Sequence, residues 1–196
     1  AALGEAKAAL RLHLRVTAGL TAGALDLASL VFHLCDTGGE TAVRLYEAMF
    51  ALCTGAVVEF GCGAKRKRVV LPPSALRPVG FEPEHALLPC DQRVFEGYRL
   101  VREYFAFPQR FLFVELTGLR EALSGCTETE FDIFVACRQA DAALERNVTP
   151  RQVALNCTPA INLFRKQADR IHITQRAAEF HVVADRTQIG RASCRE

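Results

Sequence analysis

The clearest pattern in the chain is an amphipathic segment that runs into a proline. Its aromatic and aliphatic positions recur at helical spacing and form one face: Tyr98, Val101, Tyr104 and Phe105. We therefore expect a core helix that buries this face, with Arg99, Arg102 and Glu103 on the remaining surface. Pro108 lacks the N–H that an interior helical position needs, so the helix should end at or before Phe107.

After the proline, both alternating faces of the chain are apolar over residues 111–116. This pattern is typical of a strand covered on both sides, and it predicts that Leu112 and Val114 are buried. Thr117 and Gly118 close the strand. The expected product is a rigid helix-to-strand corner, which suits a component of an assembly better than an active site.

The first third of the chain predicts two strands, one helix and two further strands. Apolar and basic residues alternate over residues 10–16, which indicates a half-buried strand with a basic face in water. The pattern then predicts a strand over residues 30–35, a helix over 42–53, and paired strands over 56–60 and 68–71. Gly55 occupies the position expected for a glycine cap at the end of that helix.

The chain divides into two regions joined by a proline-bearing connector. The predicted boundaries are a unit over residues 1–72, a connector over 73–90, a second unit over 91–187 and a tail over 188–196. Short strands are expected in the second unit over residues 131–137, 153–155, 171–173 and 180–183, while 139–147 is ambiguous between helix and loop. Many short strands and two main helices predict an α+β fold with short mixed or antiparallel sheets.

Composition narrows the classes of function. Half of the 196 residues are hydrophobic, which is enough for a core, and the formal charge of +2 predicts no strong attraction to nucleic acid or membrane. No apolar run approaches the roughly 20 residues of a membrane helix. Residues 189–196 resemble the translation of a sequencing-library adapter, so we expect this tail to pack on nothing.

The eight cysteines form no Cys-x-x-Cys pair, and the chain has no His-x-x-x-His pair, so zinc is not expected. Cys35, Cys53 and Cys137 lie within apolar patterns and are interpreted as small buried hydrophobic residues. Scattered thiols without a disulfide framework are typical of a reducing cytoplasm.

Candidate chemistry is sparse. Cys157 would need a base such as His172 or His181 to act as a nucleophile, and the sequence places neither beside it. Asp132 and Glu115 are conceivable as paired carboxylates, but both lie within predicted strands without a partner motif. We therefore assign no catalytic, cofactor-binding or metal-binding residue, and a cysteine-dependent enzyme using Cys157 is kept as an alternative.

A basic run over residues 65–68 follows the turn formed by Gly61 and Gly63. It would contact phosphate or an acidic partner, or simply be the solvated tip of a hairpin. No phosphate-binding glycine loop or dinucleotide fingerprint occurs in the sequence.

Several motifs resemble the TssF family (also called VasA or ImpG), which contributes a baseplate subunit to the bacterial type VI secretion system. They are LRPVGF at 76–81, LLP at 87–89, FEGYRL at 95–100, EYFAFP at 103–108, FLF at 111–113, LTGL at 116–119, LNCTP at 155–159 and NLF at 162–164. Cys90 replaces a tyrosine that is usual in the family. The motifs occur in the family's order, and the likeness spans residues 10–185, as for an internal portion of a longer subunit.

The resemblance implies a non-enzymatic scaffold without cofactors. Its expected partners are TssG-like and TssK-like subunits, a second TssF copy, the VgrG spike and components of the sheath and tube, with no nucleic acid and no membrane insertion. The expected location is cytoplasmic, at the inner membrane of a Gram-negative bacterium. A wedge subunit of another contractile injection system is the nearest alternative.

Overall fold

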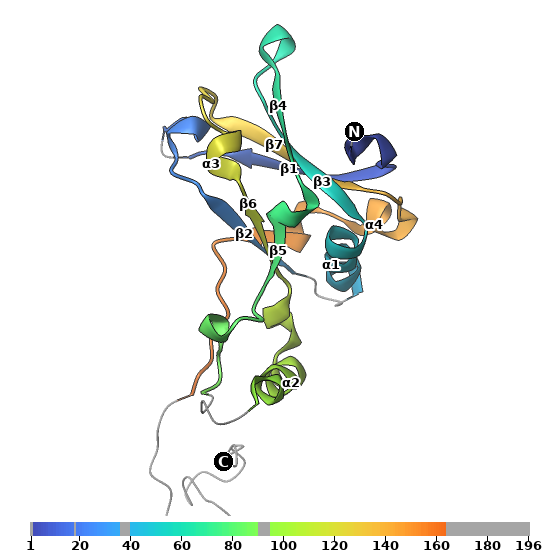
Figure 1. Ribbon diagram of the computed structural model, residues 1–196, viewed down its shortest axis with the longest axis vertical. Helices are drawn as coiled ribbons and strands as arrows, with labels where there is room; N and C mark the ends of the chain where they lie inside the picture. Colours follow the sequence, from blue (N-terminus) through green and yellow to red (C-terminus); the bar gives the residue numbers. More distant parts are fainter. Residues whose placement is uncertain (1, 18, 36–39, 90–94, 164–196) are drawn as a thin grey trace, which may run out of the picture. The chain divides into compact units, whose positions relative to one another are not determined.

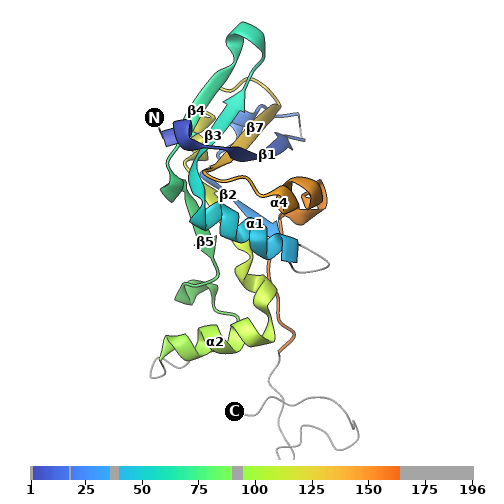
Figure 2. The same cartoon turned by 90° about the vertical axis from the view of Figure 1, so that its right-hand side faces the viewer.

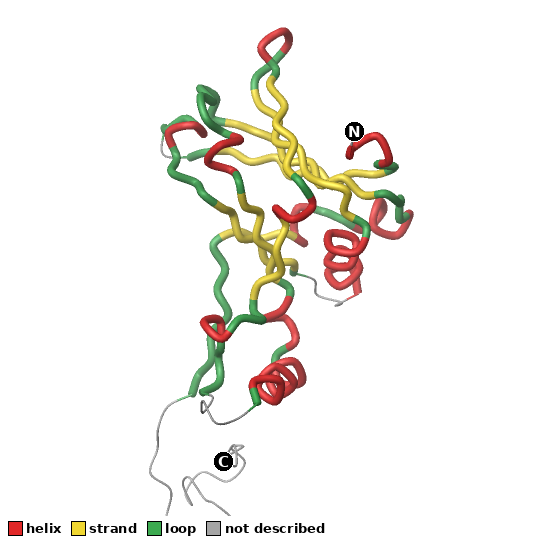
Figure 3. Tube along the Cα trace, in the orientation of Figure 1, coloured by secondary structure: helices red, strands yellow, loops and turns green. Residues whose placement is uncertain are grey.

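The computed structural model describes residues 2–17, 19–35, 40–89 and 95–163 (Figures 1 and 2). The elements below all belong to the unit Ala1–Pro159. Strands and helices are interleaved throughout this unit, as Figure 3 shows, so the predicted α+β class is confirmed.

The described strands form two four-stranded antiparallel sheets. Sheet A has the order β1-β7-β3-β4, with β1 at Ala8–Arg15, β7 at Glu130–Cys137, β3 at Cys53–Phe60 and β4 at Lys67–Leu71. Sheet B has the order β5-β6-β2-β8, with β5 at Leu76–Val79, β6 at Phe113–Thr117, β2 at Ser29–Leu34 and β8 at Val153–Leu155. The pairings join distant segments, because Leu12 of β1 lies opposite Ile133 of β7.

Both sheets draw strands from both sides of the proline-bearing connector. Sheet A combines β1, β3 and β4 with β7, and sheet B combines β2 with β6 and β8, while β5 lies within the connector itself. The predicted strands at 171–173 and 180–183 and the tail at 188–196 lie outside the described residues.

Four α-helices occur in the described residues: α1 at Glu40–Ala51, α2 at Glu96–Ala106, α3 at Leu119–Ala122 and α4 at Ala142–Asn147. The two main helices predicted from the sequence are α1 and α2. The ambiguous segment forms α4, because the Asp141 carboxylate caps it by accepting hydrogen bonds from the N–H groups of Ala143 and Leu144 at 2.7 and 3.3 Å.

The core lies between the two sheets and α1. It collects apolar side chains from β2, β3, β6 and β7, the inner face of α1 and the short helix α3. The prediction for the first strand is confirmed, because side chains alternate between half-buried and exposed along β1. Cys53 and Cys137 are buried as expected, whereas Cys35 is only partly buried.

The expected cap at Gly55 is wrong. Helix α1 ends at Ala51, and Gly55 lies inside β3, where a bulge shifts the register against β7. Its φ is 147°, and a Cβ there would approach the carbonyl oxygen of Leu71 to 2.8 Å. Gly55 therefore serves the close approach of β4 rather than the end of the helix.

The predicted corner is present. Helix α2 ends at Ala106, before Pro108, as expected. The strand begins two residues later than predicted, at Phe113, because Pro108–Phe111 forms a turn of 3-10 helix. Val114 is fully buried, and Leu112 is partly buried.

Candidate interaction surface

The aromatic face of α2 is exposed, contrary to the prediction that it packs in the core. Phe105 is 81% exposed and Tyr98 is 65% exposed, and Val101 and Tyr104 are also open to solvent. Phe95, just before the helix, is exposed and meets Tyr98 edge to face at 5.7 Å.

The side of α2 that faces inward carries charge. Arg99, Glu103 and Arg110, the last from the turn after the helix, are each at most 3% exposed. Arg99 pairs with Glu103 at 3.2 Å and with the more exposed Glu96 at 2.6 Å, and Glu103 also pairs with Arg110. These four side chains, called the ion cluster below, balance two positive charges against two negative charges.

The ion cluster fastens α2 to the preceding loop, residues 80–88. One Glu103 carboxylate oxygen accepts hydrogen bonds from the N–H groups of Leu87 and Leu88 at 3.0 and 2.9 Å. Arg99 donates to the carbonyl of Phe81 at 3.2 Å. Buried charges must be paired and hydrogen-bonded to be tolerated, and these contacts provide both.

Arg110 binds the beginning of the same loop. It donates to the carbonyls of Gly80 at 2.9 Å and His85 at 2.6 Å, and its guanidinium lies 4.6 Å from the ring centre of Phe111. Burial, reinforced by the charge of Arg99, lowers the pKa of Arg110 below its ordinary value. Its Nε has no hydrogen-bond partner among the described residues, so the carboxylate of Glu103 is the main compensation for this charge.

The burial of these charges explains why the helical periodicity gave the wrong buried side for α2. The hydrophobic pattern of α2 correctly predicts a helix, but it does not state which side faces inward. The signal for the ion cluster is present in the spacing of Glu96, Arg99 and Glu103, since residues three and four apart share one side of a helix. The contribution of Arg110 has no such local signal, because it arises from the turn after the proline.

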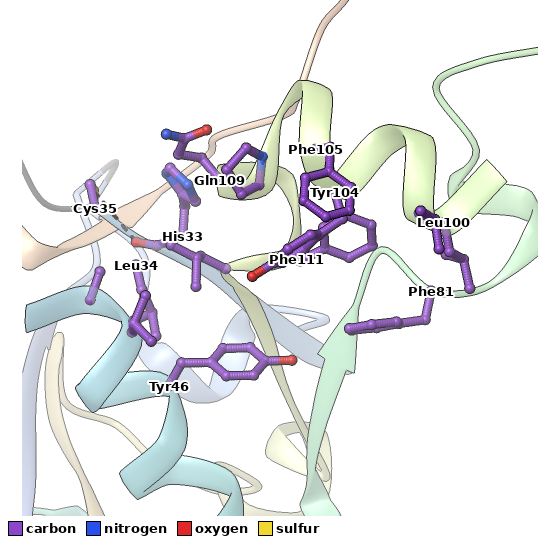
Figure 4. A pocket seen from close by; sticks show the side chains of 15 residues that line it. His33, Leu34, Cys35, Tyr46, Phe81, Leu100, Tyr104, Phe105, Gln109 and Phe111 are labelled. Carbon is purple, nitrogen blue, oxygen red and sulfur yellow. Dashed lines mark hydrogen bonds between the residues drawn. The ribbon is translucent and has the colours of Figure 1, made fainter. Parts of the chain in front are cut away.

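A groove of about 640 Å³ adjoins the aromatic face (Figure 4). Its walls come from the end of β2, from α1 and from the segment of α2 and the following turn, represented by His33, Tyr46 and Tyr104. Three aromatic rings line the groove side by side. The ring centre of Phe111 lies 5.0 Å from that of Phe81 and 6.1 Å from that of Tyr104. The lining is mainly apolar, which suits a protein side chain or another apolar group rather than a charged substrate.

The structure does not bring together the residues weighed as catalytic. Cys157 is exposed and its thiol donates only to the carbonyl of Leu155, while His172 and His181 lie outside the described residues. Asp132 lies in sheet A and Glu115 in sheet B, so they form no carboxylate pair.

Asp132 serves the surface of sheet A instead. Its carboxylate accepts from Arg11 and from His13, both at 3.0 Å, on the neighbouring strand β1. Burial alone would raise the pKa of Asp132, but these hydrogen bonds and the charge of Arg11 outweigh it and hold the pKa below its ordinary value.

The basic run lies at the tip of the β3–β4 hairpin, as predicted. Lys65, Arg66, Lys67 and Arg68 are all exposed, and the two arginines pair with Glu59 on β3. Among the described residues, no group of three or more His, Cys, Asp or Glu side chains is arranged to hold a metal ion. No helix in the described part of the chain is long and apolar enough to cross a membrane.

Large exposed apolar patches mark interaction sites on protein surfaces, and the exposed rings of α2 form such a patch. The chain belongs to the TssF family of the type VI secretion system, because the family model described as "Type VI secretion system, TssF" matches residues 1–193. This assignment favours the type VI secretion system over the alternative of a wedge subunit from another contractile injection system.

Two relatives give the extent of this likeness. The chain is 44% identical over 184 residues to the type VI secretion system component TssF1 of Pseudomonas aeruginosa, covering 94% of this chain and 29% of that protein. It also resembles a chain of a TssK-TssF-TssG baseplate subcomplex solved by cryo-electron microscopy, with a TM-score of 0.66 and 28% identity, covering 85% of this chain and 30% of that one. The chain therefore spans less than a third of the length of these relatives.

Proposed function

We propose that the chain is part of a non-enzymatic baseplate subunit that assembles with TssG-like and TssK-like subunits. Membership of the TssF family and the likeness to a chain of the TssK-TssF-TssG subcomplex support this role. The further contacts we propose are with a second copy of the subunit, with the VgrG spike and with the sheath and tube. The proposed location is the cytoplasmic side of the inner membrane.

The observation that carries the proposal is the exposed aromatic face of α2. Tyr98, Val101 and Phe105 are each more than half exposed, although the protein has a well-formed core elsewhere. Tyrosine and phenylalanine are enriched where protein interfaces are most strongly bound, since they bury large areas at low entropic cost. The ion cluster holds these rings in place, which reduces the ordering that a partner must impose on binding.

The test is assembly of the full subunit with its TssG-like and TssK-like neighbours. In the variant Tyr98→Ser/Phe105→Ser, we expect co-purification to fall by more than about tenfold, because truncation of interface anchors costs at least about 2 kcal/mol each. Leu20→Ser is the matched control, since Leu20 is a large apolar residue that is 47% exposed at a distant place in the chain.

A second arm addresses the cysteine-enzyme alternative. Cys157→Ser should leave assembly unchanged, because serine is nearly isosteric with cysteine and its hydroxyl can also donate to the carbonyl of Leu155. Assembly that survives loss of both aromatic rings would refute the role given to α2. The enzymatic alternative would replace the scaffold function if the subunit bound neither neighbour and had a catalytic activity that Cys157→Ser abolished.

A further inference from the structure

The two edges of sheet A differ in how far their basic side chains are paired with carboxylates. At the β1 edge, Arg11 pairs with Asp132 at 2.9 Å and Arg15 pairs with Glu130 at 2.7 Å. These arginines are matched by carboxylates on the neighbouring strand β7, so this surface needs no outside partner for its charge.

The opposite edge carries an excess of positive charge. The tip of the β3–β4 hairpin, residues 61–68, presents four consecutive basic side chains, and the only carboxylate paired with them in the described part of the chain is Glu59. Four positive charges against one negative charge leave an excess of three. Lys65 and Lys67 have no ion-pair partner among the described residues.

The hairpin holds this charge in a defined place. Arg68 lies directly opposite Glu59 across the β3–β4 ladder, and the Glu59 side chain is only 12% exposed. The same carboxylate pairs with Arg66 at 3.4 Å, so both guanidinium groups are oriented by one nearly buried anion. Gly61 makes the turn possible with a φ of 80°, and a Cβ there would lie 2.6 Å from the carbonyl oxygen of Lys65.

We propose that this hairpin tip docks onto an acidic surface of a neighbouring protein subunit, with Lys65 and Lys67 forming the new ion pairs. The proposal rests on the assembly function above and adds a second contact surface of defined charge. Complementary charge of this kind accelerates encounter and sets orientation, while the apolar face of α2 supplies affinity.

A protein fits the tip better than a nucleic acid. Binding of single strands needs exposed aromatic rings for base stacking, and the one aromatic residue at this end of the hairpin, Phe60, is only 6% exposed. The overall formal charge of +2 is also small for a protein that neutralises many phosphates.

The experiment measures association of the full subunit with its purified TssG-like and TssK-like neighbours at several salt concentrations. Lys65→Glu/Lys67→Glu reverses the two unpaired charges, and Lys7→Glu/Arg151→Glu is a control with the same change in net charge at exposed residues elsewhere. Equal midpoints of thermal unfolding would show that both variants are folded as stably as the wild type. A single-stranded DNA oligonucleotide is assayed in parallel.

We expect the reversal at the tip to slow association about tenfold at low salt, because like charges brought together across an interface disfavour encounter. The control should change the rate less than about twofold, and the salt dependence of the tip variant should be weaker than that of the wild type. Equal association of the tip variant and the wild type would overturn the inference and leave the assembly function intact.

Failure of the wild-type subunit to bind either neighbour would instead remove the assembly function, and the inference with it. DNA binding that is lost on reversal at the tip, with protein association unchanged, would assign the tip to nucleic acid and overturn the inference in favour of that partner.

Discussion

Helices α1 and α2 are both amphipathic, but they bury opposite sides: α1 buries its apolar side and α2 buries its charged side. In α1 the apolar side packs into the core, with Leu45 at 3% and Met49 at 2% exposure. In α2 the apolar side faces solvent, and Arg99 and Glu103 are the buried residues. The pair shows that an apolar stripe identifies a surface to be covered, and that the cover can be the protein's own core or another molecule.

The two helices are also stabilised by different forces. Helix α1 is stabilised by removal of apolar surface from water, which has no directional requirement. Helix α2 is held by hydrogen bonds to the loop at residues 80–88 and by the ion pair between Glu103 and Arg110. We expect α2 to be precisely oriented but sensitive to the loss of a single charge, whereas α1 should respond mainly to lost volume.

Replacement of Glu103 by Gln should have the largest effect. The amide keeps the shape of the side chain but leaves two buried guanidinium groups with only the half-exposed Glu96 as a counter-charge. Removing one partner of a buried ion pair costs about 3–5 kcal/mol, so the free energy of unfolding should fall by this order or α2 should detach locally. Hydrogen exchange at the amides of Leu87 and Leu88 distinguishes these outcomes.

The matched control for this change is Glu47→Gln, since Glu47 is a glutamate on α1 outside the ion cluster. It should alter stability by less than about 0.5 kcal/mol. Unchanged exchange of both loop amides in Glu103→Gln would contradict the idea that the ion cluster holds α2.

Leu45→Ala tests the other helix. Loss of a buried leucine side chain should lower the free energy of unfolding by about 2–5 kcal/mol, depending on how far the core collapses around the cavity. Urea denaturation measures the change, and Val43→Ala, on the exposed side of α1, is the control. A Leu45→Ala protein as stable as the control would mean that α1 is not part of the core.

Phe105→Ala, in contrast to Leu45→Ala, should weaken association and leave the stability of the subunit almost unchanged. The ring is 81% exposed, so the stability of the subunit alone should change by less than about 0.5 kcal/mol. Its association with the neighbouring subunits should weaken about tenfold or more if the ring is an interface anchor. Loss of stability without loss of association would place the ring inside the full subunit rather than at an interface.

Asp132→Asn should produce the smallest change and compares an exposed ion pair with the buried ion cluster. The pKa of Asp132 is lower in the folded protein than in the unfolded chain, so its ionised form favours folding. The contribution is fully present above the unfolded-state pKa and is lost in the acid range, as the pH falls through the lower folded-state pKa.

Urea midpoints of wild type and Asp132→Asn measured across this range should therefore converge at low pH. Added salt should reduce the difference at neutral pH, because the pairs with Arg11 and His13 are partly exposed. A difference that grows as the pH falls would have the wrong sign and would reject this account of Asp132.

Local patterns along the sequence determined most of the elements. Alternation predicted β1, and the apolar run after Pro108 predicted β6 to within two residues, because side-chain period and proline geometry act over a few neighbouring residues. The capping of α4 by Asp141 is also local, although the sequence left that segment undecided.

Tertiary structure decided the pairing of the strands and the orientation of α2. The partnership of β1 with β7 joins residues more than a hundred positions apart, and no periodicity within either strand specifies it. Gly55 likewise acquired its role from the approach of Leu71 on β4 and not from the helix that precedes it.

The sequence of α2 determined that one side would be apolar and the other charged. Only the surroundings determined which side is buried, because Arg110 and the backbone of residues 80–88 supply the partners that make burial of Arg99 and Glu103 tolerable. Buried charge depends on groups that come together in three dimensions, whereas apolar burial requires only an apolar side chain. For this reason the exposed aromatic face, the surface on which the proposed function rests, became visible only in the folded structure.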